Sequence, residues 1–414
     1  MGEVTALECV RCGRAYREDE VLYTCPVCGP SGILDVVYDY EALQARGFGP
    51  ERLAGDPNRT HWRYMDLLPI APGAALPPVP VGGTPVFQLP DLADRHGLRE
   101  LWIKDEGRNP TGSFKDRASS VAAVKARQLG FHTVCCASTG NAASSLAGFA
   151  AQLGLTAFIF VPEFAPEAKV AQLLIFGATV FVVKGSYLEA FELCSEAATT
   201  LGWYNRSAAI NPYAIEGKKT GGLELGEQMA GSVPDWVSVS VGDGCTIAGI
   251  WKGLKELHRF GVIDRLPRLL GTQAKGAAPL VEAWRSGDEH WASVDASTIA
   301  DSISVGHPRN GLKALRAVRE SGGVLVEVTD EEILGAEADL AVHGVFGEPA
   351  GVAGLAGIQQ ARSSGIIGPQ DRVVHVMTGS GLKDAASARR AADREPTVIE
   401  PSLGAVQEAL EDAR

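Results

Sequence analysis

The sequence predicts an α/β fold in which a parallel sheet is covered by helices on both faces. Short β-rich runs alternate with helical patterns through most of the chain, which is typical of strands joined by helical crossovers. Several runs end in glycine-rich or hydroxyl-rich loops, and ligands of such folds bind beyond the carboxyl ends of the strands. The expected strands are 101–104, 133–137, 157–161, 179–183, 236–241, 269–273, 324–328 and 373–377.

Helical patterns fill the connections between these runs, for example at 166–176 and 188–201. Pro166 stands at the first position of its helix, where proline is tolerated because that N–H has no helical partner. Thr329 and Glu332 form a T-x-x-E capping box before Ile333, which predicts a helix start there.

The composition is that of a globular protein without a polyanionic partner. The chain has 414 residues, of which 45% are hydrophobic and 21% charged, enough for one or two cores and two or three domains. A net charge of -12 without any run of Lys or Arg argues against a nucleic-acid partner. The first ten residues lack a signal pattern, and no apolar stretch is long enough to span a bilayer. We therefore expect a cytoplasmic protein that does not enter a membrane.

Two C-x-x-C pairs near the N-terminus have zinc-ribbon spacing. The pairs are separated by a short strand-like stretch, and four thiolates would close a tetrahedral site with no position open for chemistry. We expect a structural zinc site, with a metal-free ribbon or a redox pair as alternatives. The ligands would be Cys9, Cys12, Cys25 and Cys28.

The loop after strand 101–104 reads D-E-G-R-N-P-T-G-S-F-K-D-R. Asn109, Pro110 and Gly112 predict a turn, and Ser113 is expected to cap a helix with Lys115 in its first turn. The positive end of the helix dipole disfavours the ammonium form and keeps the amine reactive. Lys115 is therefore a candidate Schiff-base lysine, and the alternative is a surface lysine at a helix start.

The strand at 133–137 is followed by S-T-G-N and a helix of small residues. The first N–H groups of that helix and two hydroxyls can bind an anion such as the carboxylate of an amino acid. The candidate substrate-binding residues are Ser138, Thr139, Gly140, Asn141 and Ala142.

A glycine-rich turn after strand 236–241 opens another helix. Backbone N–H groups in such a turn can hold a phosphate monoester, although a tight strand-to-helix turn without a ligand has the same pattern. The glycine spacing differs from the dinucleotide fingerprint. The residues of this phosphate cup would be Gly242, Asp243, Gly244, Cys245 and Thr246.

The strand at 373–377 ends in T-G-S-G-L-K-D. The Thr378 hydroxyl can hydrogen-bond a ring nitrogen without keeping it protonated, as a carboxylate would. The alternative is an N-cap threonine that touches no ligand.

In this order the four loops resemble those of fold type II pyridoxal-phosphate enzymes, most closely threonine synthase and its near relatives. N-P-T-G-S-F-K-D, S-T-G-N, N-P-Y-x-x-E-G-K-K-T, P-R-L-L-G-T-Q-A, E-P-A and T-G-x-G-L-K-D together cover nearly all of the chain beyond the ribbon. The resemblance implies pyridoxal 5'-phosphate as cofactor, with Lys115 as Schiff-base lysine and general acid/base. It also implies that Phe114 stacks beside the cofactor ring and that Asn141 contacts the pyridine hydroxyl. The cup would hold the cofactor phosphate, and Thr378 would contact the ring nitrogen.

The resemblance also implies a tryptophan synthase β-like architecture of two parallel-sheet α/β domains, and a homodimer. We expect a zinc-ribbon segment at 1–36, a connector at 37–99, a lysine-loop and substrate-loop region at 100–215, a large cofactor-phosphate region at 216–395 and a C-terminal tail at 396–414.

The sequence departs from the family pattern where threonine synthase would bind the phosphate of O-phosphohomoserine. An Arg and two hydroxyls are missing, at Ala214, Ala142 and Ala209, Thr246 ends the cup in place of Asn, and Ser380 replaces a His. A phosphate dianion would be poorly paired in such a pocket.

Three nearby cations, Arg206, Lys218 and Lys219, are candidates to replace the missing groups, the alternative being a solvated surface role. The main hypothesis is a threonine synthase-like lyase that performs elimination or replacement on a small amino acid, with an altered phosphate site. The alternatives are an authentic threonine synthase, a threonine or serine dehydratase, and a non-catalytic regulatory protein that binds the cofactor.

Overall fold

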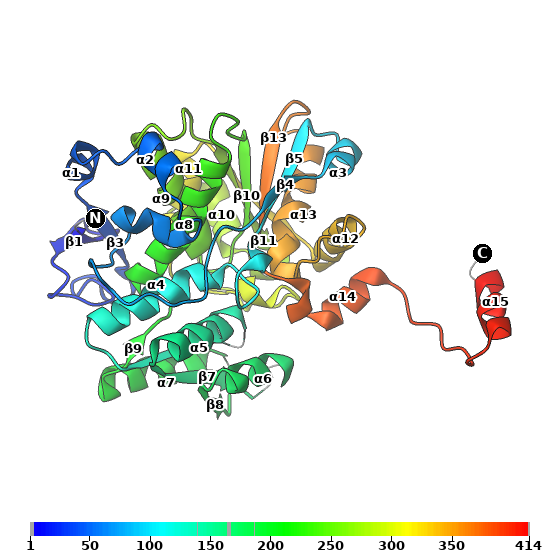
Figure 1. Cartoon of the computed structure of the whole chain (residues 1–414), viewed down its shortest axis with the longest axis horizontal. Helices are drawn as coiled ribbons and strands as arrows, with labels where there is room; N and C mark the ends of the chain where they lie inside the picture. Colours follow the sequence, from blue (N-terminus) through cyan, green and yellow to red (C-terminus); the bar gives the residue numbers. More distant parts are fainter. Residues whose placement is uncertain (1–3, 139, 164–166, 186, 413–414) are drawn as a thin grey trace.

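The computed structural model describes residues 4–138, 140–163, 167–185 and 187–412. Figure 1 shows two parallel sheets, a small N-terminal sheet beside them, and a C-terminal helix apart from the rest. No helix of the described residues is long and apolar enough to cross a membrane.

The larger sheet has the strand order β12-β11-β10-β13-β5-β4. Its strands are parallel except β4, which pairs antiparallel with β5 through Phe87 and Ile103. β4 was not expected from the sequence, because three residues are too few for a readable pattern. The strands are β4 (Val86–Gln88), β5 (Glu100–Asp105), β10 (Trp236–Ser240), β11 (Arg268–Ala274), β12 (Val324–Val328) and β13 (Arg372–Met377).

The smaller sheet has the order β8-β7-β6-β9 and is parallel throughout. Its strands are β6 (Thr133–Ala137), β7 (Thr156–Pro162), β8 (Thr179–Val183) and β9 (Tyr204–Asn205). β9 lies at one edge and, among the described residues, pairs with β6 alone, where Cys135 lies opposite Asn205.

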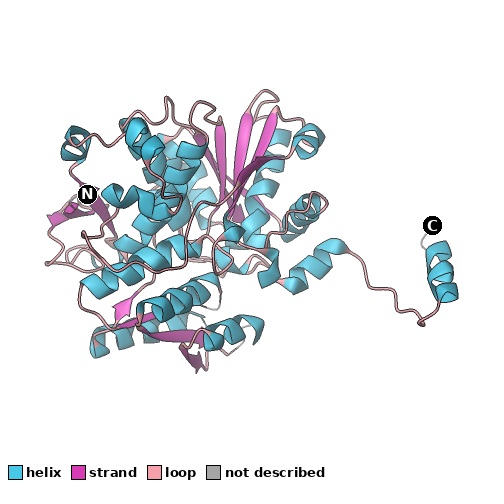
Figure 2. Ribbon diagram, in the orientation of Figure 1, coloured by secondary structure: helices cyan, strands magenta, loops and turns pink. Residues whose placement is uncertain are grey.

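Helices cover both faces of the larger sheet (Figure 2). A Cβ on Gly357 would lie 2.0 Å from the Thr272 hydroxyl, so α13 meets β11 at a distance only glycine allows. On the other face, α9 brings Ile247 against Gly271. The helices of the parallel-sheet body are α3 (Pro90–Arg95), α4 (Lys115–Gln128), α5 (Asn141–Leu153), α6 (Glu167–Ile175), α7 (Tyr187–Leu201), α8 (Pro212–Gln228), α9 (Cys245–Arg259), α10 (Pro279–Ser286), α11 (Gly311–Glu320), α12 (Asp330–Ala341), α13 (Pro349–Ser363) and α14 (Ala385–Ala392).

The N-terminal segment forms a separate antiparallel sheet of order β2-β1-β3. Its strands are β1 (Val4–Cys9), β2 (Ala15–Tyr16) and β3 (Leu34–Tyr38), and it is followed by α1 (Tyr40–Ala45) and α2 (Pro50–Gly55). At the other end of the chain, α15 (Leu403–Asp412) follows an extended segment.

Most predicted elements are present. Strands 133–137, 179–183 and 324–328 are found with the expected bounds, and Thr329 and Glu332 form the predicted capping box. Pro166 lies outside the described residues.

The prediction that Ser113 caps the Lys115 helix is wrong, because Phe114 occupies the N-cap position and makes no side-chain cap. Ser113 instead pairs with Gly379 in an isolated β-bridge, a contact between distant segments that local sequence does not reveal.

Candidate active site

A cavity lies where the carboxyl ends of β10 and β13 meet the first residues of α4, α5 and α9. This is the ligand-binding edge expected of a parallel sheet. The lining residues include Lys115, Asn141, Lys218, Gly242, Asp243, Gly244, Cys245, Thr246, Glu348 and Thr378. The cavity therefore brings together all four loops that the sequence singled out.

Lys115 is the first residue of α4 and is partly buried in the cavity. Burial lowers the pKa of its ammonium to about 7, and the positive charges of Lys218 and Arg206 act in the same direction. A large share of Lys115 is therefore neutral at physiological pH, so its amine can form a covalent bond or accept a proton.

The loop that contains Thr378 is tied directly to the start of α4. The backbone N–H of Phe114 donates to the Thr378 carbonyl at 2.8 Å, and the Ser113–Gly379 bridge continues this pairing. Thr378 thus lines the cavity with Lys115. Phe114 does not line it, because its ring packs against Gly221 and Arg117.

Of the S-T-G-N loop, Asn141 is the residue that lines the cavity. Its amide nitrogen donates to Glu348 at 2.5 Å, while its Oδ1 is buried without a partner among the described residues. A bound ligand with a hydroxyl or amine donor would satisfy that oxygen. Ser138 accepts from the N–H of Gly140 and caps the turn. Gly140 and Ala142 are not lining residues, and Thr139 lies outside the described residues.

Glu348 was not among the site residues predicted from the sequence. It precedes Pro349, the first residue of α13, so the E-P-A motif marks a helix start at the cavity. The E-P-A motif was the sequence feature that could have indicated Glu348, but only the fold shows that Glu348 lies opposite Asn141.

The glycine-rich turn of the predicted cup leads from β10 into α9. Gly244 has φ +90°, and a Cβ there would lie 2.7 Å from the Asn310 carbonyl oxygen. Asp243 holds the neighbouring segment, because its Oδ1 accepts from the Arg309 N–H at 2.6 Å. The first N–H groups of α9 have no helical acceptor and open at the cavity, which suits a phosphate group.

The three candidate cations have different surroundings. Lys219 is buried in ion pairs with Glu216 at 2.6 Å and Glu256 at 3.0 Å. Lys218 lines the cavity, is 3% exposed and has no carboxylate ion pair among the described residues. Burial lowers the pKa of Lys218 and the charge of Arg206 acts in the same direction, while Cys245 and Asp243 act against them.

Arg206 is the second buried cation beside Lys115 and is also 3% exposed. Its Nε donates to the Ser119 hydroxyl at 2.9 Å, and its guanidinium lies 3.5 Å from the Lys115 carbonyl oxygen. None of the three is a solvated surface residue, so that alternative is wrong.

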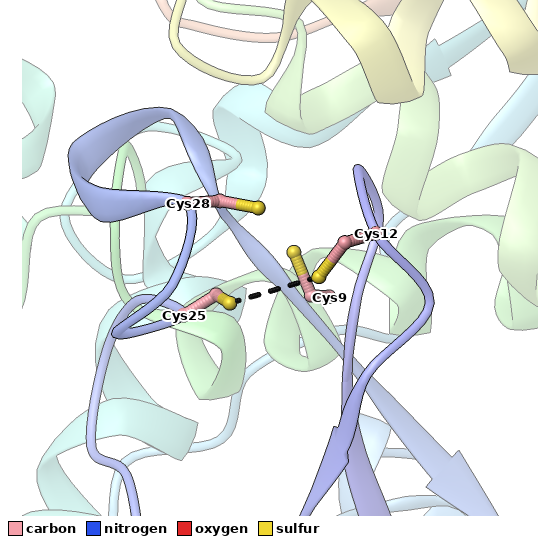
Figure 3. A group of neighbouring side chains, drawn as sticks. All are labelled: Cys9, Cys12, Cys25 and Cys28. Atoms are coloured by element: carbon pink, nitrogen blue, oxygen red, sulfur yellow. Dashed lines mark hydrogen bonds between the residues drawn. The ribbon is translucent and has the colours of Figure 1, made fainter.

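The N-terminal cysteines converge on one point (Figure 3). The sulfurs of Cys9, Cys12, Cys25 and Cys28 all lie within 4.8 Å of one another, and those of Cys12 and Cys25 are 3.8 Å apart. A tetrahedral zinc with Zn–S bonds of about 2.3 Å requires sulfurs about 3.8 Å apart. The four thiols can therefore hold a tetrahedral metal ion, remote from the cavity.

Comparison with known proteins agrees with this geometry. The family model for pyridoxal-phosphate dependent enzymes matches residues 79–379. Threonine synthase of Methanosarcina acetivorans is 40% identical over 98% of both chains, and that of Methanocaldococcus jannaschii is 40% identical over 98% of this chain and 99% of its own. Threonine synthase of Mycobacterium tuberculosis is 38% identical over 78% of this chain and 88% of its own.

Solved structures of similar fold share less sequence. Threonine deaminase isoform 2 of Solanum lycopersicum has a TM-score of 0.65 at 23% identity, covering 75% of this chain and 87% of its own. Maize serine racemase has a TM-score of 0.64 at 22% identity, covering 80% and 92%. These two likenesses establish the fold.

Proposed function

This chain belongs to the pyridoxal-phosphate dependent enzymes as a threonine synthase-like carbon-oxygen lyase, and we propose that it converts O-phosphohomoserine and water into threonine and phosphate. The observation that carries the choice of substrate is the pair of buried cations, Lys218 and Arg206, beside Lys115.

The cavity fits the cofactor of this family. We propose that Lys115 supplies the amine that binds it, the turn at Gly242–Thr246 its phosphate cup, and Thr378 the contact to its ring nitrogen. The Oδ1 of Asn141 is buried without a partner in the described part of the chain, and in this proposal it would accept from the ring hydroxyl of the cofactor. When bound, pyridoxal phosphate supplies an aldehyde that condenses with amines and a ring that withdraws electrons from the α-carbon of an amino acid.

Lys115 is the group that moves protons in this proposal. Its amine, with a pKa near 7, takes a proton from Cα and then one from Cβ of the substrate, and later returns protons to Cγ and Cα. The bond between Cγ and the phosphate oxygen breaks, phosphate leaves with the electron pair, and a water oxygen adds at Cβ. The balance is one water consumed and one phosphate released.

Lys218 and Arg206 would hold the substrate's phosphate. A buried ammonium without an ion-paired carboxylate is costly unless an anion joins it, and Lys218 is such a group among the described residues. The two cations thus offer a replacement for the groups that are absent at Ala214 and Ala142. The hypothesis of a substrate with an altered or absent phosphate is not confirmed. Lys219 is unsuited to this role, because Glu216 and Glu256 already pair with it.

We also propose that the four cysteines bind a structural zinc ion. The sulfur positions support this, since the 3.8 Å separation of Cys12 and Cys25 and the 4.8 Å limit for the group allow a closed tetrahedral site with no position left for substrate.

The test is to supply the purified holoenzyme with O-phosphohomoserine and to measure phosphate, threonine and 2-keto acid together. Equal amounts of phosphate and threonine are expected. Turnover of serine or threonine to a 2-keto acid, with no phosphate release, would instead favour the dehydratase alternative.

The substrate-phosphate contact is tested with Lys218→Met. We expect KM for O-phosphohomoserine to rise about 10- to 100-fold, because a charge-assisted contact contributes about 1.5–3 kcal/mol. Lys255→Met is the matched control, since Lys255 lies on α9, the helix that the cup opens, has a side chain 41% exposed and pairs with Glu320 of α11 outside the cavity. An unchanged KM in Lys218→Met would refute the assignment of this residue.

A further inference from the structure

The loop between the two cysteine pairs contacts the catalytic body next to the proposed phosphate site. The hydroxyl of Tyr23 accepts a hydrogen bond from the backbone N–H of Asn205 at 2.7 Å. Asn205 is 2% exposed and belongs to β9, the edge strand of the smaller sheet. An edge strand leaves N–H groups without a sheet partner. Tyr23 therefore satisfies a buried donor that β6 does not reach.

Arg206 follows Asn205 directly. Its backbone N–H donates to the Cys135 carbonyl, and its side chain reaches Ser119 on α4. The position of the guanidinium thus depends on where β9 lies against β6. A shift of β9 would move the Arg206 charge relative to Lys115 and Lys218.

A second contact links the same loop to both helices of the site. Lys125 donates to Glu18 at 2.7 Å, and its ammonium lies 4.6 Å from the centre of the Tyr213 ring. Lys125 is on α4, which begins at Lys115, and Tyr213 is on α8, which contains Lys218. Glu18 therefore stabilises the point at which these two helices meet.

We propose that the loop at 17–24 is a positioning element for the cations that bind the substrate's phosphate, with Tyr23 as its main positioning residue. This inference rests on the proposed function, because it concerns the same phosphate. It gives the cysteine module a role in substrate affinity and none in the chemical step, since Tyr23 touches neither the cavity nor Lys115 in the described structure.

The test compares Tyr23→Phe with Tyr40→Phe, both as holoenzymes. Each variant loses one phenolic hydroxyl, but Tyr40 donates to Glu256, a contact that does not involve β9. Three quantities are measured: KM and kcat for O-phosphohomoserine, the dissociation constant of inorganic phosphate, and amide hydrogen exchange of a peptide spanning 203–208.

In Tyr23→Phe we expect KM and the phosphate dissociation constant to rise about fivefold, the amount that corresponds to one hydrogen bond. kcat should stay within about twofold, and the exchange of the 203–208 peptide should be faster. Tyr40→Phe should change none of these. Glu18→Gln, with the cysteine pairs intact, should raise the phosphate dissociation constant in the same direction.

Unchanged phosphate affinity in Tyr23→Phe, or an equal loss in Tyr40→Phe, would overturn the inference. If Tyr23→Phe does not fold, Glu18→Gln decides in its place. Failure of the proposed function is seen separately, as a wild-type enzyme that binds inorganic phosphate but releases none from O-phosphohomoserine.

Discussion

Two groups of buried charges lie on different sides of α8, and they differ in how those charges are paired. On one side, Lys219 is surrounded by Glu216 and Glu256, and Tyr38 donates to Glu216. On the other side, Lys218 faces the cavity near Arg206 and Lys115 without an ion-paired carboxylate among the described residues.

This difference in pairing indicates a structural role for the charges around Lys219 and a binding role for Lys218. Burial raises the pKa of Glu216, but Lys219 and Lys252 more than offset this and hold it below its usual value. These charges balance within the protein and join α8 to the N-terminal strand β3. At the cavity, Lys218 has no ion-paired carboxylate among the described residues, so a bound anion would balance its charge, which is expected of a binding site.

The largest effect is expected from Lys115→Ala, which removes the proton carrier of the cavity. Turnover of O-phosphohomoserine should fall on the order of 10²–10⁴-fold or more. The measurement is phosphate release, with the circular dichroism spectrum as a control for folding. Activity close to that of the wild type would leave the cavity without a catalytic function.

Lys219→Met should break the paired group. Removing the cation takes the ion pair from Glu256 and leaves Lys252 as the remaining ammonium beside Glu216, so the free energy of unfolding should fall by about 3–5 kcal/mol. Urea denaturation measures this. If the variant were as stable as the wild type, Lys219 would not be needed to stabilise the buried Glu216 and Glu256.

Lys218→Met should not cause such a loss of stability. Its ammonium is buried without an ion pair among the described residues, so replacement by an apolar side chain should leave the apoprotein equally stable or more stable. The same urea titration compares the two variants, which change one charge each at adjacent positions. If Lys218→Met lowered the free energy of unfolding as much as Lys219→Met does, the two lysines would not differ in how their charges are paired.

The stability of the apoprotein should also depend on pH. Because the pKa of Lys115 is about 7 in the folded state and near 10.5 when unfolded, the unfolded chain binds more protons between these values. Stability should therefore rise with pH across this window, by up to about 1.4 kcal/mol per pH unit, relative to Lys115→Met.

Lys218→Met should move the lower end of this window upward, since the charge of Lys218 helps to lower the pKa of Lys115. Urea titrations at a series of pH values provide the measurement. Lys219→Met should leave the window in place, and an equal shift in both variants would contradict the assigned cause.

Much of the fold and the cofactor site could be predicted from the sequence, because both follow from local patterns. β-rich runs separated by helical segments indicated β6, β8 and β12, and the loops after β5, β6, β10 and β13 indicated Lys115, Asn141, Gly244 and Thr378. Ser113 was misassigned, since its pairing with Gly379 joins segments far apart in the chain. The domain boundaries, the homodimer and the cytoplasmic location stay predictions.

What only the tertiary structure decided is which of two neighbouring lysines faces the cavity. Lys218 and Lys219 have the same charge and the same local sequence, so no pattern distinguishes them. Successive residues on a helix point about 100° apart, and the packing of α8 between the cavity and the N-terminal sheet assigns one lysine to each side. The sequence by itself determined the residue types and the elements, whereas the pairing of the buried charges depends on contacts between distant segments.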